Sequence, residues 1–576
     1  MESLPATYEV PSLEEDPALG LSHRAKMEIL FAVMLGLFLG ALDQTIVGPA
    51  LPTIVTQLSG NDYYVWAITI YLLTSTISVP FWGKLSDVYG RKPIFMIGIV
   101  IFLIGSALSG LSQNMAMLIL FRGIQGIGAG SLFPVALAVI GDLFTPQERG
   151  KYQGLFGAVF GIAFVAGPLI GGFLTESVGW HWIFYVNIPI GIIALIVIQR
   201  LLPTVKTKSA TRNFDLIGGF IFTVAMVFLL VGLTNKQFSD WSDFSVGGFI
   251  AIGLVGTLLF IFAESRAKEP IIPLDLWKGR TYSATMVSVF FAAFAFFGAI
   301  VFLPRWFQVV EGFSPTNSGL AALPLMIGLI FSSIVSGLIV SRTGHYKWLI
   351  VGSTILMGFA VLLMTSLTKD TSVPMVWLWM LIAGLGVGPT FSVPTIVIQN
   401  AVPFRQLGVA TSNLTFFRQI GGTIALAFVG TIFGTTFKDQ LVPQMQAAGV
   451  PAPVLAGFGQ ASAGGGFDFN QLTGVGDMGA AILASVPPAF QAIVAPAVPA
   501  MVEGIHGAFS LAVGQTFWLG VFGAIVATIA AVAIKEIPLR TSNEQPVYGE
   551  APAAAGLAPK PVAEGIARST SQPTAD

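Results

Sequence analysis

A single carboxylate interrupts the first long apolar stretch of the chain. Between residues 29 and 47 almost every residue is apolar or glycine, and Asp43 is the only charged one. Placing a charged carboxylate in hydrocarbon costs roughly 2.5–3.5 kcal/mol on insertion scales, so such a group usually faces a bundle interior or a water-filled cavity. We therefore interpret Asp43 as a site that takes up a proton or a cation. The alternative is an acid near a helix end that extends towards the outer headgroups.

A second charge, Arg122, lies inside the fourth apolar stretch. At ~1.5 Å per helical residue, Arg122 lies about 12 Å from the start of its stretch near Asn114. By the same rise per residue, Asp43 lies about 24 Å from the start of its own stretch near Met27. Since the first and fourth crossings run in opposite directions, both charges fall in the outer half of the membrane. We expect them to pair directly or through water; a purely structural ion pair is the alternative to a functional one.

Polar residues in other apolar stretches are candidates for lining a ligand cavity. Arg418 is the only clear charge deep in the second half of the chain, about 16 Å into the thirteenth stretch at the same rise per residue. Its alternative role is packing against backbone carbonyls at a broken helix. The candidate cavity residues are Gln44, Gln125, Gln308, Gln399, Phe417, Arg418 and Gln419.

The composition is that of a membrane protein and excludes several other classes. Of the 576 residues, 54% are hydrophobic and only 10% are charged, against about 25% charged in soluble domains. The chain has no cysteine, which excludes disulfides and thiolate metal sites. It also has no Gly-x-Ser-x-Gly element and no phosphate-binding loop. We therefore predict no enzyme activity, no metal and no cofactor, and the dispersed basic residues do not indicate nucleic-acid binding.

Fourteen apolar stretches are long enough to cross a hydrocarbon core of about 30 Å, which takes roughly 20 helical residues. They lie near residues 27–50, 63–83, 93–112, 115–141, 152–176, 181–201, 214–234, 245–265, 282–308, 317–341, 347–367, 374–399, 407–435 and 507–534. Lys and Arg are concentrated in alternate loops, which marks those loops as cytoplasmic. The sequence thus predicts a multi-pass protein of the plasma membrane with both termini in the cytoplasm.

Two loops share a pattern that divides the chain into halves. Gly83–Lys92 follows the second stretch and Gly337–Lys347 follows the tenth, and each has Gly at its first and eighth positions with basic residues afterwards. Repeats of this kind place a ligand site between the halves, near the middle of the membrane. The predicted domains are a cytoplasmic segment (1–26), a six-helix half (27–202), an inserted helix pair (203–270), a second six-helix half (271–540) and a cytoplasmic tail (541–576).

Two segments fall outside this frame. Residues 436–505 form a predicted loop outside the membrane, rich in Gly, Ala and Pro, and this loop is a candidate contact for a partner protein. Its later part, about residues 479–494, is either an apolar helix or a flexible linker. Residues 541–576 contain few large apolar groups, so we predict a disordered tail.

The loop Gly83–Lys92 predicts a contact between helix ends on the cytoplasmic side. Its glycines allow a tight turn and close helix approach, and Asp87 can lie near helix termini and the basic residues that follow. The pattern resembles the signature of the major facilitator superfamily between its second and third spans, although Val88 stands where that family often has a basic residue. The resemblance implies a cytoplasmic gate that stabilises the outward-facing state, formed by Gly83, Asp87, Gly90, Arg91 and Lys92.

Two further motifs resemble the antiporters of that superfamily. Arg122-Gly-Ile-Gln125 is similar to the fourth-span motif, whose Arg is linked to proton transfer. In the fifth span, Gly154, Gly167, Pro168, Gly171 and Gly172 resemble the antiporter pattern, with Ala163 where Gly is usual. Small residues allow close helix contact and proline bends a helix, so the resemblance implies a hinge between the halves. Generic Gly-rich packing is the alternative.

The resemblance covers about residues 27–535 and is to the fourteen-span drug–proton antiporters. It also rests on Leu42–Pro52, Trp180–Pro189 and Gln399–Gly422, with Gly48 where Asn is frequent. It implies an all-α integral membrane protein with the major facilitator fold: fourteen transmembrane helices in two pseudo-symmetric six-helix halves plus two inserted helices. It further implies a monomer in which Asp43 and Arg122 couple inward proton movement to export.

The substrate class follows less directly from the resemblance. Relatives that expel dications often carry a further acid deep in the second half, whereas Glu311 of this chain falls near the outer surface. We therefore expect a multidrug-efflux exporter of lipophilic, neutral or monocationic small molecules, driven by the proton gradient. The alternatives are a dedicated exporter of a lipid or metabolite, and a non-transporting membrane receptor or assembly partner.

Overall fold

The computed structural model describes residues 21–58, 64–202, 215–236, 239–455, 478–486 and 488–540. Within these ranges the chain is helical and contains no strand, as predicted. Thirteen of the described helical segments are long and apolar enough to cross a membrane. Helix α2 (Tyr64–Tyr89) contains more Ser and Thr but has 26 residues and packs along α4 like the others. Together they account for the fourteen predicted spans.

The first half of the chain forms one bundle. Its helices are α1 (His23–Gln57), α2, α3 (Arg91–Gly110), α4 (Met115–Leu143), α5 (Pro146–Ser177), α6 (Trp182–Tyr185) and α7 (Asn187–Leu201). Helix α4 packs against α1, α2 and α3, while α1 also packs against α5 and α7. The approach of α4 is close because its glycines meet backbone: a Cβ on Gly128 would lie 2.3 Å from the backbone N of Phe102 in α3.

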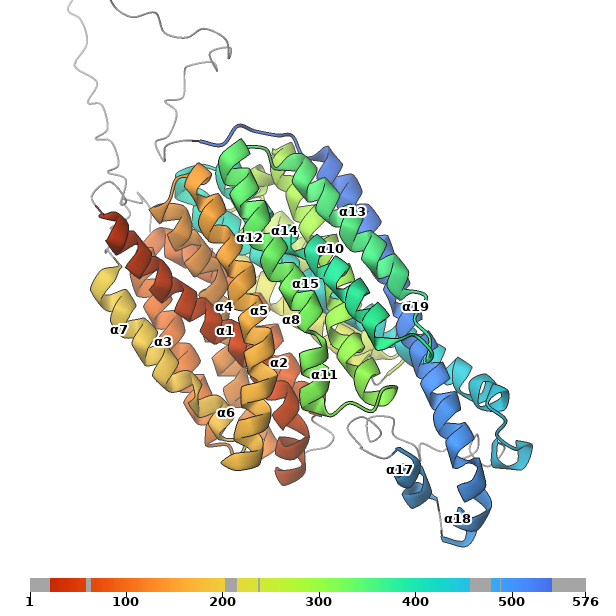
Figure 1. The fold of residues 1–576 in the computed structure, drawn as a ribbon. Helices are drawn as coiled ribbons and strands as arrows, with labels where there is room; N and C mark the ends of the chain where they lie inside the picture. The colour runs from red at the N-terminus through yellow and green to blue at the C-terminus, as the bar shows by residue number, and fades with distance from the viewer. Residues whose placement is uncertain are drawn as a thin grey trace, which may run out of the picture. The chain divides into compact units, whose positions relative to one another are not determined.

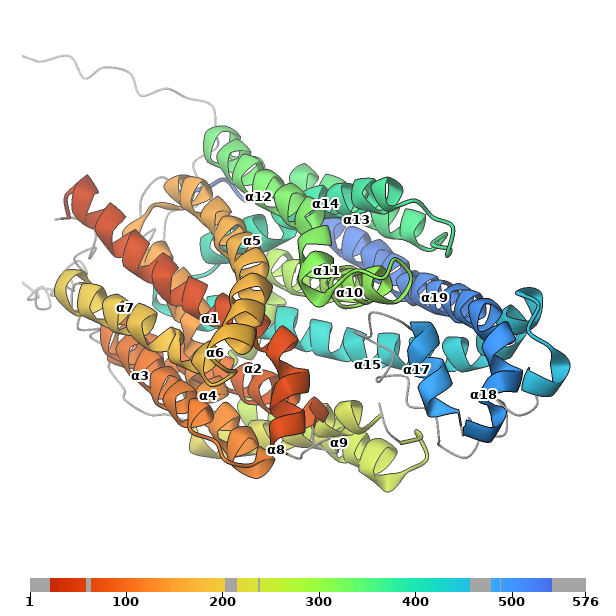
Figure 2. The ribbon, with the colours of Figure 1, turned by 60° about the horizontal axis from the view of Figure 1, so that its bottom comes forward.

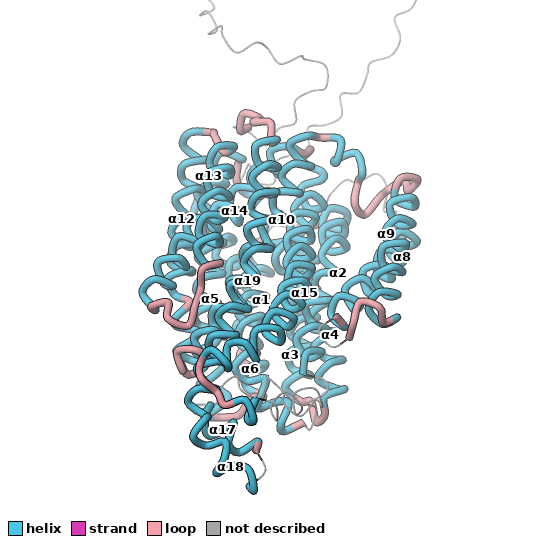
Figure 3. The backbone as a smooth tube through the Cα atoms, turned by 90° about the vertical axis from the view of Figure 1, so that its right-hand side faces the viewer, coloured by secondary structure: helices cyan, strands magenta, loops and turns pink. Residues whose placement is uncertain are grey.

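The second half forms a similar bundle. Its helices are α10 (Arg280–Val309), α11 (Pro315–Ala321), α12 (Leu323–Thr343), α13 (Lys347–Met364), α14 (Val373–Ala401), α15 (Leu407–Ala447) and α19 (Val498–Ala533). Between the two bundles in sequence come α8 (Leu216–Asn235), a π-helical turn (Phe244–Gly248) and α9 (Phe249–Glu264). Helices α8 and α9 pack on each other, and α8 also contacts α2 and α15 (Figure 3). The short helical segments Leu274–Lys278 and Phe404–Gln406 precede α10 and α15.

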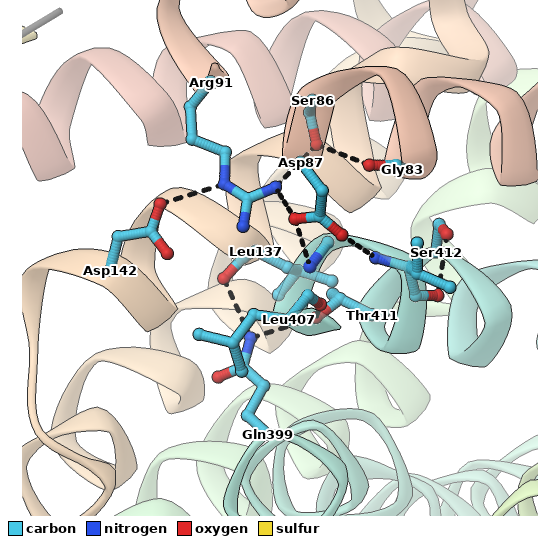
Figure 4. A network of polar contacts seen from close by, with 12 residues as sticks. Gly83, Ser86, Asp87, Arg91, Leu137, Asp142, Gln399, Leu407, Thr411 and Ser412 are labelled. Carbon is cyan, nitrogen blue, oxygen red and sulfur yellow. Dashed lines mark hydrogen bonds and ion pairs between the residues drawn. The ribbon is translucent and has the colours of Figure 1, made fainter. Parts of the chain in front are cut away.

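One end of the bundles carries most of the basic residues, and we call it the basic end. Helix α1 begins there and α19 ends there (Figure 1). Figure 4 shows part of this end, including Arg91. The predicted N-terminal segment up to residue 20 and the predicted tail from residue 541 lie outside the described residues.

The structure corrects the predicted loop at residues 436–505, because both flanking helices run far into it. Helix α15 continues to Ala447 and α19 already begins at Val498. With 41 residues, α15 is about 62 Å long, twice the thickness of a hydrocarbon core of about 30 Å. The apolar-helix alternative for residues 479–494 is confirmed, since α17 (Met478–Ser485) and α18 (Pro488–Val494) lie there (Figure 2).

These outer helices form what we call the helical projection: residues 436–447 of α15, α17, α18 and residues 498–506 of α19. Apolar residues at helical spacing, Phe437, Leu441 and Met445, are buried in one core with Met501 and Ile505 of α19. A Cβ on Gly504 would lie 2.6 Å from the Cα of Met445, so the two helices touch backbone to backbone. This core explains why a segment rich in Gly, Ala and Pro is helical.

Candidate functional site

Asp43 lies in α1 with its side chain fully buried and accepts three hydrogen bonds. Its Oδ2 accepts from Nη1 of Arg122 at 2.7 Å. Its Oδ1 accepts from Nε2 of Gln125 and from Nδ2 of Asn187, both at 2.8 Å. Arg122 Nη1 also donates to Oε1 of Gln125 at 2.8 Å. The two charges that the sequence placed at the same depth are therefore in direct contact, and an amide side chain bridges them.

Neutral residues complete the surroundings of this pair. The guanidinium of Arg122 lies over the ring of Tyr71, 4.1 Å from its centroid, which is a favourable cation–π geometry. Ser106 accepts from Nδ2 of Asn187 at 3.1 Å and donates to the backbone oxygen of Phe184 at 2.8 Å. Asn187, Ser106 and Tyr71 were missed as site residues. The sequence signal available for Asn187 was its position as a polar residue inside the apolar stretch 181–201, within the segment Trp180–Pro189 that carries the family resemblance.

The pair is balanced in charge, which decides what removal of one member does. Taking two ions out of water is costly, and their attraction offsets that cost only when geometry and further hydrogen bonds are good. Here the distance is 2.7 Å and each ion has additional partners. Removing only one charge leaves the other buried and unpaired, which costs about 3–5 kcal/mol. A proton on Asp43 would disturb the same balance without any mutation.

The predicted gate joins the two halves at the basic end (Figure 4). Asp87 Oδ1 accepts from the backbone N–H of Gly408 at 3.0 Å, and Oδ2 accepts from that of Val409 at 2.8 Å. These are N–H groups of the first turn of α15, which have no partner within their own helix. A carboxylate of α2 thus caps a helix of the other half, where the helix dipole also favours negative charge.

One basic residue, Arg91, holds Asp87 in place. Arg91 pairs with Asp87 at 2.5 Å and with Asp142 at 2.9 Å, and its Nη1 donates to Ser86 at 2.7 Å. Asp142, at the end of α4, was missed as a gate residue. Lys92 does not join this cluster, because it donates to the backbone oxygen of Gln199 in α7 at 2.7 Å. Three of the five predicted gate residues, Gly83, Asp87 and Arg91, therefore meet at the contact with α15, whereas Lys92 ties α3 to α7.

The glycines of the internal repeat make equivalent contacts in the two halves. A Cβ on Gly83 would lie 2.4 Å from Cβ of Ser412 in α15, and one on Gly337 would lie 2.1 Å from the backbone oxygen of Gly150 in α5. The eighth-position glycines, Gly90 and Gly344, both have positive φ, 93° and 72°, a conformation that glycine adopts without strain. The repeat read from the sequence is therefore a pair of inter-half helix crossings.

A carboxylate also fixes the second loop of the repeat. Glu536, just after α19, accepts from the backbone N–H groups of Tyr346 at 2.8 Å and Lys347 at 3.4 Å. Burial opposes ionisation, but these N–H groups and neighbouring His345 outweigh it and hold the pKa of Glu536 below its usual value. Because Lys347 begins α13, Glu536 stays ionised where the α13 dipole favours a negative charge.

We expect Asp87→Asn to loosen the basic end. The amide loses the ion pair with Arg91 and can accept only one of the two backbone bonds, so about 2–3 kcal/mol of the preference for this closed arrangement disappears. Because the chain has no cysteine, Val409→Cys, buried at the crossing, supplies a single thiol. Its reaction with a membrane-impermeant maleimide should become roughly ten- to hundredfold faster in the Asp87→Asn background.

The control for this experiment is Asp275→Asn, which removes an exposed ion pair with Lys278 at the same end. Surface pairs contribute little, so Val409→Cys should react at its original rate there. Equal maleimide reaction rates in the Asp87→Asn and Asp275→Asn backgrounds would show that Asp87 does not hold the basic end closed.

The predicted hinge glycines of α5 make two separate contacts. Gly154 faces α12, where a Cβ would lie 2.7 Å from the Cα of Ile334. Gly167 and Gly171 instead face α1, where Cβ atoms would lie 2.0 Å from Oγ1 of Thr45 and 2.3 Å from the backbone oxygen of Ile46. Thr45 also donates to the backbone oxygen of Ala163 at 3.0 Å. Helix α5 thus joins the helix that carries Asp43 to the other half.

The other two hinge residues, Pro168 and Gly172, follow Gly167 and Gly171 directly in the sequence of α5 but face a different helix. Pro168 is met by α11, since a Cβ on Gly319 would lie 3.3 Å from its Cβ. A Cβ on Gly172 would have only Thr316 of α11 within reach, at 3.7 Å, so this glycine is not required for a close approach.

The structure does not gather the seven candidate cavity residues in one place. Gln125 belongs to the Asp43 cluster, and Gln399 lies at the basic end, donating to the backbone oxygen of Leu137 at 3.0 Å. Gln308 donates to Ser318 at 2.7 Å, and the ring of Phe417 packs on Trp277 with centroids 5.0 Å apart. Gln44 and Gln419 are half-buried. Arg418 alone lines a small cavity, between α10, α14 and α15.

Aromatic rings cross from the first half to this cavity. Phe133 of α4 stacks on Phe160 of α5 at 5.0 Å, and Phe160 meets Phe391 of α14 at 5.6 Å between centroids. Phe391 meets Phe296 of α10 at 5.4 Å, and Phe296 meets Phe297 at 5.4 Å. We call these five side chains the aromatic row. It is a run of ring-to-ring contacts that crosses from the first half to the second.

Comparisons with known proteins agree with this architecture. Residues 33–426 match the model of the Major Facilitator Superfamily, and the chain belongs to that family. It is 42% identical over 423 residues to the multidrug transporter protein MdtP of Bacillus subtilis, covering 72% of this chain and 78% of that protein. It is 32% identical over 530 residues to the tetracenomycin C resistance and export protein of Streptomyces glaucescens, covering 92% and 95%.

A solved structure shows the same fold. The proton:xylose symporter XylE superposes with a TM-score of 0.56 at 12% identity, over 88% of this chain and 95% of that one. The predicted fold class and family are therefore confirmed. The chain is a multi-pass membrane transporter.

Proposed function

We propose that this protein is a proton-coupled exporter of lipophilic, neutral or monocationic compounds, of the multidrug-efflux type. The observation that carries the proposal is the fully buried Asp43–Arg122 pair, because a proton on Asp43 would remove the charge that balances Arg122. The names of its relatives support the efflux class, since both the MdtP protein and the tetracenomycin C protein are named as transport or export proteins.

Orientation follows from the distribution of Lys and Arg. The positive-inside rule places the basic end in the cytoplasm of a cell whose plasma membrane holds the protein. Asp87, Gln399 and Gly337 then close the cytoplasmic side, which is the side that is closed in an outward-facing state. Protons enter from outside and reach Asp43 in this state.

The coupling step is a change in the charge balance at Asp43. Protonation neutralises the carboxylate, which weakens its hold on Arg122 and, through Thr45 and Ile46, the contact of α1 with α5. Because α5 also crosses α12 at Gly154, the disturbance reaches the closed basic end and favours its opening. Substrate binds from the cytoplasm, Asp43 releases its proton there, and the pair forms again. Each charge that crosses 100 mV contributes roughly 2.3 kcal/mol, so the membrane potential adds to the pH gradient.

The test is transport by the purified protein in proteoliposomes with an imposed proton gradient. A lipophilic dye should move against its own gradient when the proton gradient is present, and should stop when a protonophore collapses it. A matched sodium gradient should drive nothing. Dye movement that is unaffected by the protonophore would overturn proton coupling. Dye movement driven by the sodium gradient would show that sodium is the coupling ion instead.

A further inference from the structure

Arg418 has a charge that no described residue of its own half neutralises. Helices α10, α12, α13 and α14 contain no acid, and α15 and α19 contain only Asp439 and Glu503, both in the helical projection. The buried acid of the other half, Asp43, is already paired with Arg122. Across the described part of the chain, no carboxylate lies within ion-pair distance of Arg418.

Its hydrogen-bonding capacity is also only partly used. Nη2 donates to the backbone oxygens of Thr390 at 3.2 Å and Phe391 at 3.4 Å, in the part of α14 between Pro389 and Pro394. A guanidinium carries five N–H groups, so Nε and Nη1 retain three that make no hydrogen bond to the described residues. The side chain is half-buried and borders a cavity of about 10 Å³, which is room for about one water. These donors become available to a larger ligand when α10 and α14 move apart in the transport cycle.

The wall beside Arg418 is aromatic. The guanidinium lies 4.5 Å from the centroid of Phe391, and Phe296 and Phe297 line the same cavity. This end of the aromatic row thus combines rings at 71° and 82° to one another with a directional donor. A lipophile with one ring packed against these phenylalanines would bring a peripheral oxygen within reach of Nε and Nη1.

We propose that Arg418 binds the carbonyl or carboxylate oxygen of an aromatic lipophile whose rings pack on Phe296, Phe297 and Phe391. This inference rests on the proposed export function and narrows its substrate class: an oxygen acceptor is required, and a permanent cation without one is the poorest ligand. Carbonyl and carboxylate share the chemistry that a guanidinium recognises, and a carboxylate gains a second, charge-assisted bond.

Binding of three matched probes tests the proposal. We would measure energy transfer from the protein's tryptophans to pyrenebutyrate, its methyl ester and a pyrenylbutyl-trimethylammonium ion, with the full chain in lipid nanodiscs. Arg418→Gln should weaken binding of the carboxylate by about tenfold or more and of the ester by a smaller factor. Binding of the ammonium probe should stay unchanged or improve. Arg418→Lys, which keeps the charge without the planar fork, should fall between.

The matched control is Arg266→Gln, because Arg266 also stacks on a phenylalanine, Phe262 at 4.0 Å, but at the end of α9. It should bind all three probes as the wild type does. Phe297→Ala should weaken all three alike, since it removes ring surface rather than a donor. If Arg418→Gln does not fold, the lysine and alanine variants still separate the two contributions.

Three results would overturn the proposal. The first is equal loss of the three probes in Arg418→Gln, and the second is carboxylate and ester binding that resists both Arg418 variants. The third is failure of the wild type to bind carboxylate or ester. These readouts need no proton gradient. Gradient-driven dye export without Arg418-dependent probe binding would therefore contradict only this inference. Arg418-dependent binding without gradient-driven export would contradict only the proposed proton coupling.

Discussion

Asp43→Asn is expected to abolish proton-driven export while dye still equilibrates down its own gradient. Asparagine matches the shape of the carboxylate but cannot take up a proton. Its NH₂ group would replace one of the two carboxylate oxygens that now accept hydrogen bonds from Arg122, Gln125 and Asn187. Arg122 would also lose its counter-ion, at a cost of about 3–5 kcal/mol. In proteoliposomes, uphill accumulation should fall at least about a hundredfold, to the level of empty vesicles.

Two further variants serve as comparisons for Asp43→Asn. Asp240→Asn changes an acid whose side chain is 91% exposed, and coupled export should survive it. Asp43→Asn combined with Arg122→Gln removes both charges, so thermal stability should recover towards the wild type while coupling stays absent. Uphill export by Asp43→Asn at the wild-type rate would show that another group carries the proton.

Gly150→Val should destabilise the state in which the basic end is closed. A Cβ at Gly150 would lie 2.4 Å from the backbone oxygen of Gly337, a distance that only separation of α5 and α12 can relieve. Overpacking of this kind costs about 1–3 kcal/mol, and here the cost falls only on the state with a closed basic end. Export should drop roughly five- to hundredfold, and a thiol at Val409→Cys should become reactive from the basic end.

Gly352→Val provides the comparison, because a Cβ there would meet nothing within 4 Å. It introduces the same side chain into α13 and should leave both export and labelling unchanged. If Gly150→Val transports normally, the crossing of α5 and α12 is not a contact that the cycle must re-form.

The sequence predicted those parts of the site that stand out chemically from a hydrocarbon environment. Asp43 and Arg122 were identified because a charge in an apolar stretch needs a partner, and the depths of two helices then matched. The repeat glycines, Gly83 and Gly337, were identified because their spacing recurs. Asn187 and Ser106 were not identified, since neutral polar residues occur in most membrane helices and only tertiary contact separates those that matter.

Two other predictions failed for a different reason: local composition does not determine tertiary position. Glutamines in apolar stretches were grouped as cavity residues. In the structure, Gln399 donates a hydrogen bond to Leu137 and Gln308 donates one to Ser318, at separate sites. The segment after residue 435 was taken as a loop because of its Gly and Pro. Its helicity depends on burial of Phe437, Leu441 and Met445 against α19, which no local window reveals.

The length of α15 also makes the transport cycle observable from outside the cell. On the proposed orientation, about half of its roughly 62 Å lies beyond the hydrocarbon core. Helix α15 is continuous from the gate at Gly408 to Ala447. A small tilt of the second half therefore displaces the far end of this helix by a larger distance than it displaces the gate. A spin label on exposed Lys438 or Gln446 would therefore read out each opening and closing of the distant gate without touching the cavity.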